Sequence, residues 1–253
     1  MGAGINDYII TLDVDWASDD VINYVADKFI EKNVKATWFI THDSQAVRKL
    51  FTYPDLFEIG WHPNFMSGST HGKNPEEVLK HIKNIYPDAI SVRTHGLFQS
   101  SPLLKLLRDK FEIKYDSSIF LPYTSHIQPH VMYYQGSKEF IRLPYFWADY
   151  TETNMKDADF SISNPKYHVE GMKIFNFHPI HIALNTSTLD TYDRLKAKVN
   201  MQECKQSNID EYRNKGVSGA ENIFLEVIKI NVTKGGGKLL REVGQEWFEK
   251  NSS

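Results

Sequence analysis

The chain has 253 residues, of which 41% are hydrophobic and 24% are charged, and its formal net charge is −3 at pH 7. This length suffices for one large α/β domain or two small ones, and the composition is that of an ordinary globular protein. The small negative charge argues against nucleic acid as a partner. Cys204 is the only cysteine, which excludes an intramolecular disulfide and a zinc site built from thiolates.

No apolar run approaches the length of about 18 residues that a membrane span needs. The chain reaches an apolar segment at Tyr8 without the basic-then-apolar pattern of a signal peptide. We therefore expect a cytoplasmic protein with no membrane span. The sequence leaves the oligomeric state open.

Short apolar segments alternate with amphipathic ones along most of the chain. The apolar segments predict buried strands at residues 8–12, 35–40, 57–62, 89–93, 113–116, 139–143 and 173–178. The amphipathic segments predict helices at residues 18–33, 41–50, 75–86, 101–107, 221–231 and 239–250. Residues 117–135 are expected to form a long loop, and residues 185–219 a polar excursion on the surface.

Alternating strands and helices imply a parallel sheet with right-handed crossovers. We expect an α/β fold, a distorted (β/α) barrel of about seven parallel strands. One catalytic domain would span residues 1–253, with a helical extension from about residue 185. A doubly wound open sheet would bring fewer of the polar strand-end residues together.

Polar side chains stand where the predicted strands end. They are Asp13, Asp15, His62, Arg93, Asp116 and His178. In a parallel barrel these ends form one face, which holds the active site.

The first strand ends in two carboxylates, Asp13 and Asp15, which strand alternation places on the same side. Buried carboxylates are costly unless a cation or hydrogen-bond donors compensate them. A metal site or an acid–base pair would provide that compensation. The plainer alternative is a turn aspartate plus an aspartate that caps the next helix.

An ordered series of motifs over residues 8–184 resembles the polysaccharide deacetylase family, also called carbohydrate esterase family 4 or the NodB-homology domain. The motifs are Thr11-Leu12-Asp13-Val14-Asp15, Gly60-Trp61-His62, Arg93-Thr94-His95-Gly96, Tyr115-Asp116-Ser117-Ser118 and Phe175-Asn176-Phe177-His178-Pro179. The resemblance implies that Asp13 is the general base and Asp15 a metal ligand. The family usually has adjacent acids followed by glycine, whereas here Val14 separates them.

The resemblance also implies two histidine ligands, which the family spaces four residues apart. His62 matches the first, but the position of the second holds Met66. We assign His71 as the second ligand, with Asn64 as its competitor and His95 as a further candidate should His71 not bind. The set Asp15, His62 and His71 would suit zinc, while cobalt, nickel and manganese remain possible.

By the same resemblance, Arg93 pairs with the base and keeps its pKa low, and His178 is the general acid. Asp116 orients or tunes the catalytic groups, although a turn-forming aspartate is an equal alternative. His95 stands where the family has proline and would touch the substrate. A main-chain amide at Gly96 or Leu97 would help to hold the oxyanion.

Tyr145 and Trp147 are the expected apolar walls against a sugar ring, although core packing is the commoner use of such residues. The resemblance implies a metal-dependent N-deacylase, a deacetylase or deformylase. Its expected substrate is an N-acylated amino sugar precursor of bacterial surface polysaccharide, O-antigen or capsule. The alternatives are a metal-dependent amidohydrolase of a small non-sugar amide and a non-catalytic carbohydrate-binding barrel.

Overall fold

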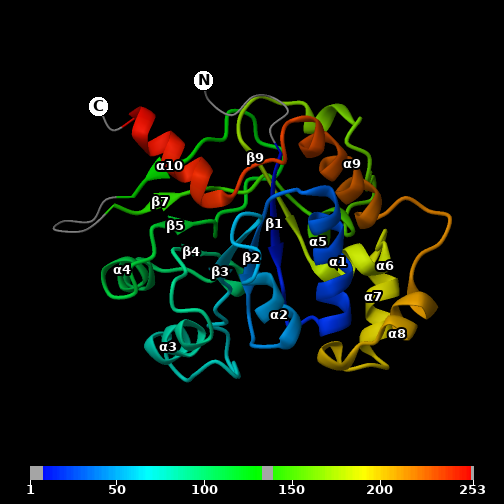
Figure 1. Cartoon of the computed structure of the whole chain (residues 1–253), viewed down its shortest axis with the longest axis horizontal. Coiled ribbons are helices and arrows are strands. Elements are labelled where there is room, and N and C mark those ends of the chain that lie inside the picture. Colours follow the sequence, from blue (N-terminus) through cyan, green and yellow to red (C-terminus); the bar gives the residue numbers. More distant parts are fainter. Residues whose placement is uncertain (1–7, 133–138, 252–253) are drawn as a thin grey trace.

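The computed structural model describes residues 8–132 and 139–251 (Figure 1). Within these ranges nine strands form one sheet in the order β6-β7-β5-β4-β3-β2-β1-β9-β8. The strands are β1 (Tyr8–Asp13), β2 (Ala36–Ile40), β3 (Phe57–Trp61), β4 (Ser91–Val92), β5 (Tyr115–Asp116), β6 (His130–Val131), β7 (Ile141–Arg142), β8 (Trp147–Ala148) and β9 (Lys173–Phe177). Neighbouring strands are parallel throughout, except that β6 pairs with β7 in antiparallel fashion. The sheet is curled into an incomplete barrel, with β6 and β8 as its edges.

Helices connect most of the strands and cover the outside of the sheet. The α-helices are α1 (Asp19–Lys32), α2 (Gln45–Leu50), α3 (Pro75–Ile85), α4 (Ser101–Asp109), α5 (Asp149–Glu152), α6 (Pro179–Leu184), α7 (Leu189–Lys196), α8 (Gln206–Tyr212), α9 (Ala220–Thr233) and α10 (Leu240–Asn251). The described residues also form three 3₁₀ turns, which are η1 (His95–Leu97), η2 (Pro165–Tyr167) and η3 (Met201–Glu203). No helix in the described ranges is long and apolar enough to cross a bilayer.

Local sequence explains where the first helix begins and ends. The Ser18 side chain accepts a hydrogen bond from the amide of Val21, and Asn33 ends α1 in the left-handed conformation. Between these caps α1 buries an apolar face that includes Val25 and Phe29. This face packs on the sheet, where Phe29 meets the Trp38 ring of β2 edge-on.

The parallel sheet and its distorted barrel confirm the predicted fold class, and each of the seven predicted strands is present. The additional strands β6 and β8 have two residues each, too few to leave an alternating pattern. The predicted loop at residues 117–135 contains β6, and its residues 133–135 lie outside the described part of the chain. The polar excursion at 185–219 contains α7, η3 and α8.

The last helix closes the end of the sheet at which the strands begin. Helix α10 lies against β5 and β7, as Figure 1 shows. Its first amides meet two buried side chains: the amide of Leu240 donates to Thr37 Oγ1 over 2.9 Å, and that of Arg241 donates to Glu58 Oε2 over 2.8 Å. Glu58 also accepts hydrogen bonds from Thr37 and Ser91. A carboxyl of β3 thus binds the N-terminus of a helix far along the chain.

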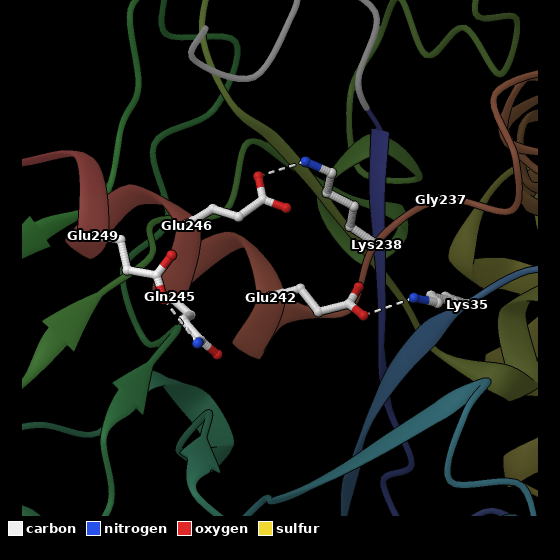
Figure 2. Close-up of a pocket in the computed structure, with 7 residues that line it drawn as sticks. All are labelled: Lys35, Gly237, Lys238, Glu242, Gln245, Glu246 and Glu249. Atoms are coloured by element: carbon white, nitrogen blue, oxygen red, sulfur yellow. Dashed lines mark hydrogen bonds and ion pairs between the residues drawn. The ribbon is translucent and has the colours of Figure 1, made fainter.

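A hollow of about 350 Å³ lies beside this helix and is lined by α10, the segment before it and Lys35 just before β2 (Figure 2). Two ion pairs line it, Lys35 with Glu242 and Lys238 with Glu246, each at 2.6 Å. Its charges are therefore largely paired within the chain. The hollow brings no cluster of catalytic groups together.

The Glu58→Gln substitution tests the docking of α10. Burial raises the pKa of Glu58, against the opposing effect of its hydrogen bonds from Ser91 and Arg241. The native state therefore holds this proton more tightly than the unfolded chain does. Glu58 contributes most to stability below its unfolded pKa of about 4.3, and the contribution is lost as the pH rises through the native pKa.

We therefore expect the free energy of unfolding of Glu58→Gln, measured relative to that of wild type, to be higher at about pH 8 than at about pH 5. Urea unfolding at both pH values measures this difference. Glu249→Gln, at an exposed position of the same helix, is the matched control. A difference that does not change with pH would contradict the prediction.

Candidate active site

Asp13 is the last residue of β1, and Asp15 follows in a turn. Asp15 and Trp16 have positive φ angles of 43° and 56°, an uncommon conformation for residues other than glycine. The amide of Trp16 donates to Thr41 Oγ1 over 3.0 Å, which holds this turn against the end of β2. Such strained backbone often accompanies functional sites. Here it turns the Asp15 carboxylate toward the ends of β3 and β4.

Three side chains from three loops converge at this point: Asp15, His62 and His95. Asp15 Oδ1 lies 3.2 Å from His62 Nε2 and 2.9 Å from His95 Nδ1, and the two nitrogens are 3.3 Å apart. Atoms bound at about 2.0–2.2 Å around a tetrahedral ion are about 3.3–3.6 Å apart. The triangle is therefore close to the size that a zinc-like cation requires.

The orientation of His62 agrees with a role as ligand. Its Nδ1 lies 2.7 Å from the carbonyl oxygen of Arg93. Because a carbonyl can only accept, Nδ1 carries the hydrogen, and the lone pair of a neutral ring is on Nε2, facing Asp15 and His95. Burial lowers the pKa of His62, but the charges of Asp13 and Asp15 outweigh it and raise that pKa. The surroundings thus favour positive charge at this point.

The structure places His71 outside this group, in contrast to the predicted ligand set. His71 Nδ1 accepts a hydrogen bond from the amide of Asn64 over 3.2 Å, and the ring stacks on His81. Trp16 contacts the rings of both His71 and His95. Burial, together with the neighbouring His81 and His62, lowers the pKa of His71 to about 4. His95, expected to touch substrate, occupies the position assigned to His71.

Asn64, the competing candidate, is also engaged elsewhere. Its Oδ1 accepts a hydrogen bond from the amide of Met66 over 3.0 Å. Since Asn64 and His71 bond to each other through the Asn64 amide, the loop between β3 and α3 is folded onto itself. Neither residue belongs to the triangle of ligand atoms.

Asp13 is held by a buried network beside the triangle. Arg93 Nη1 donates to Asp13 Oδ1 over 3.1 Å, and Asn176 Nδ2 donates to Asp13 Oδ2 over 2.7 Å. Burial raises the pKa of Asp13, but the charges of His62 and Arg93 lead among the effects that lower it overall. Asp13 is thus an ionised carboxylate at neutral pH, as a general base must be. Asn176, two residues before His178, is a partner that the sequence analysis did not single out.

His178, the predicted general acid, forms a dyad with Asp149. Its Nδ1 lies 2.6 Å from Asp149 Oδ1, and its backbone amide donates to Asp149 Oδ2 over 2.6 Å. Burial lowers the pKa of His178, but Asp149, followed by Asp15 and Asp13, raises it to about 10. The ring is therefore protonated at neutral pH, and its Nε2 lies 3.5 Å from Asp15 Oδ2.

Asp149 was missed because it follows β8, which is too short to be seen in the sequence. With His178 and His181 it forms a second group of potential ligand atoms. The short Asp149–His178 contact makes this group a hydrogen-bonded dyad instead. His181 lies behind it, where burial, more than any other effect, lowers its pKa to about 4.

Asp116 bonds to residues around the site rather than to Asp13 or His178. Its Oδ2 accepts from Arg142 Nε over 2.7 Å, and its Oδ1 accepts from Ser118 Oγ over 2.6 Å. Among the described residues, the hydrogen bonds and ion pairs of its side chain go to Ser118 and Arg142, not to Asp13 or His178. The alternative interpretation, that Asp116 is a turn-forming aspartate, accounts for its hydrogen bonds from Ser118.

The predicted aromatic walls are mostly internal. Trp147 is fully buried, and its indole donates to Glu152 Oε2 over 3.0 Å, so it offers no surface to a substrate. Tyr145 is 5% exposed and packs over the Arg93 guanidinium. Two partly exposed rings near the site were not predicted. Trp16 packs on His95, and Tyr192 packs on His181. Burial raises the pKa of Tyr192, and the negative charge of Asp15 raises it further.

The chain matches a known protein family. Residues 10–196 match the model of a family described as WbmS-like polysaccharide deacetylase. No curated protein sequence matches the chain.

Several solved structures are similar to this chain. A protein from Bordetella bronchiseptica, described as a polysaccharide deacetylase involved in O-antigen biosynthesis, is 27% identical with a TM-score of 0.78, covering 88% of this chain and 90% of its own. The peptidoglycan deacetylase PdaC of Bacillus subtilis is 14% identical, with a TM-score of 0.45 and coverages of 97% and 96%. A family 4 acetyl xylan esterase of Clostridium thermocellum, in complex with cobalt, is 14% identical, with a TM-score of 0.44 and coverages of 93% and 89%.

Zinc affinity distinguishes a site completed by His95 from a site completed by His71. We expect His95→Ala to weaken zinc binding by more than about 100-fold, beyond what loss of an outer hydrogen-bonding partner typically costs. His71→Ala should leave zinc affinity within a few-fold of wild type, because none of its atoms belongs to the triangle. Chelator competition on the purified protein measures both. Loss of zinc in His71→Ala with retention in His95→Ala would restore the set expected from the sequence.

Proposed function

The chain belongs to the WbmS-like polysaccharide deacetylase family, a family of hydrolases acting on carbon–nitrogen bonds other than peptide bonds, and we propose that it is a metal-dependent N-deacylase. Its substrate class would be an N-acylated amino sugar precursor of bacterial surface polysaccharide. One observation carries the proposal: an ionised carboxylate, Asp13, and a histidine, His178, both lie beside the side chains of a single group of potential metal ligands. Asp13 Oδ1 lies 3.8 Å from His62 Nδ1, and His178 Nε2 lies 3.5 Å from Asp15 Oδ2.

Asp15, His62 and His95 would hold the cation. We propose zinc, because one carboxylate and two imidazoles suit it and leave room for further ligands. When bound, the cation would polarise the acyl oxygen and make the attacking water more acidic. The same donor set accepts cobalt, nickel or manganese.

Asp13 would act as the general base. Arg93 and Asn176 hold its two oxygens, which fixes the carboxylate in place and leaves lone pairs to accept a proton from water. The Arg93 charge also keeps the carboxylate ionised. The base is thus oriented before the substrate arrives.

His178 would act as the general acid. Its protonated ring would donate from Nε2 to the departing amine nitrogen as the carbon–nitrogen bond breaks. Asp149 holds the opposite ring nitrogen and stabilises the protonated form. The pair gives the leaving group a proton source on the side of the Asp15 carboxylate.

The description of the Bordetella bronchiseptica relative supports a substrate in O-antigen biosynthesis. We propose that the enzyme acts in the cytoplasm on an acetylated or formylated amino sugar attached to a nucleotide or lipid carrier. A small non-sugar amide is the second candidate substrate. The paired base and acid argue against a purely carbohydrate-binding barrel, which would need neither.

Release of acetate or formate from acylated amino sugar nucleotides and lipid-linked amino sugars tests this function. With zinc-loaded protein we expect Asp13→Asn and His178→Ala each to lower kcat by about 10²- to 10⁴-fold, the usual contribution of a general base or acid. His126→Ala, at an exposed histidine, should retain wild-type activity. Activity on small amides but on no amino sugar would favour the amidohydrolase. No turnover of either class by metal-loaded protein would favour the binding barrel.

Asp149→Asn tests the dyad. Removing this negative charge lowers the pKa of His178, so the ring loses its proton at a lower pH. We expect kcat to fall at least about tenfold at pH 8 and its alkaline limb to move to lower pH, with unchanged zinc content. A pH profile that coincides with wild type would show that Asp149 does not support the acid.

A further inference from the structure

The loop that carries His95 has an unusual backbone. Gly96 and Leu97 follow His95 with φ angles of 61° and 55°, so two successive residues are left-handed, and one of them has a side chain. The His95 side chain itself is 29% exposed. The ring contacts Trp16, His62 and Asp15, and these contacts require that the turn bearing His95 be held in place.

Ser118, just beyond β5, contacts this loop on both sides of His95. Its Oγ accepts a hydrogen bond from the amide of Thr94 over 2.9 Å. Its carbonyl accepts one from the side chain of Gln99 over 3.0 Å. Thr94 and Gln99 flank the turn that contains His95, so a single buried residue ties both of its ends.

The Ser118 hydroxyl has no freedom to turn away from Thr94. It donates to Asp116 Oδ1 over 2.6 Å, and the Ser118 amide donates to the same oxygen over 3.1 Å. With its hydrogen bound to a carboxylate, the hydroxyl presents only lone pairs to Thr94. Arg142 completes the support, because it donates to Asp116 and also to Gln99 Oε1, over 2.7 Å each.

We propose that Ser118, oriented by Asp116, is a positioning residue that holds His95 at the metal site and thereby sets metal affinity. The proposal rests on the ligand set given above and adds residues that contact neither metal nor substrate. It also gives Asp116 a task, since its carboxylate would act through Ser118 on the ligand loop.

The neighbouring Ser117 offers a matched control. It is as fully buried as Ser118, but its hydroxyl accepts from Arg93 Nη2 over 2.8 Å and so supports the base side of the site. We expect Ser118→Ala to weaken zinc binding about 10- to 100-fold, as loss of an outer partner of a ligand does. Ser117→Ala should change zinc affinity less than about threefold while lowering kcat.

Chelator competition gives the affinities, and the visible absorption of the cobalt-loaded protein reports ligand geometry. We expect Ser118→Ala to change the cobalt spectrum and Ser117→Ala to leave it like wild type. In a His95→Ala background, Ser118→Ala should have no further effect on zinc affinity, because the residue it positions is gone. Gln99→Ala, at an exposed position, removes the other tie and provides the test should Ser118→Ala not fold.

Equal losses in Ser117→Ala and Ser118→Ala, or an undiminished loss in the His95→Ala background, would overturn the positioning role while leaving the metal site intact. Unchanged zinc affinity in His95→Ala itself would overturn the ligand set as well. These outcomes need no catalytic turnover, so they remain distinct from a failure to find the substrate.

Discussion

A fully buried guanidinium at the centre of the curled sheet organises the rest of this molecule. Arg93 is 0% exposed, and its donors reach Thr11 and Asp13 on β1, Ser117 after β5 and Asn176 on β9. Phe39 and Tyr145 lie over it, each 4.6 Å from the guanidinium carbon. A buried cation is costly unless its donors are satisfied, so these strands must keep their relative positions. The same contacts hold the Asp13 carboxylate and keep it ionised.

The placement of the central residues could be predicted from the sequence. Strands of a parallel sheet end along one edge, so polar residues at strand ends come together whatever the details of the loops. Asp13, Asp15, His62 and Arg93 follow this rule, and His178 follows it from the last long strand. The fold class was predictable for a related reason, because apolar and amphipathic segments alternate along residues 8–178.

The rest depended on how loops fold, which no periodicity reports. His71 and His95 both lie in loops after strands, and only the folded loops show that His95 lies beside Asp15 and His62, whereas His71 Nδ1 bonds to the Asn64 amide. Asp149 follows a strand of two residues that leaves no pattern in the sequence. The buried position of Trp147 is likewise a matter of packing, since an aromatic residue beside a site serves a core equally well.

The attachment of α10 to the opposite end of the sheet bears on how the chain folds during synthesis. Thr37 and Glu58 belong to strands made early, whereas the amides that bind them come from Leu240 and Arg241. Until those residues leave the ribosome, the Glu58 carboxyl lacks a main-chain donor that the finished protein supplies. The beginnings of the neighbouring strands also remain uncovered. The sheet can therefore reach its final packing only after residue 241 has emerged, long after its first strands have been made.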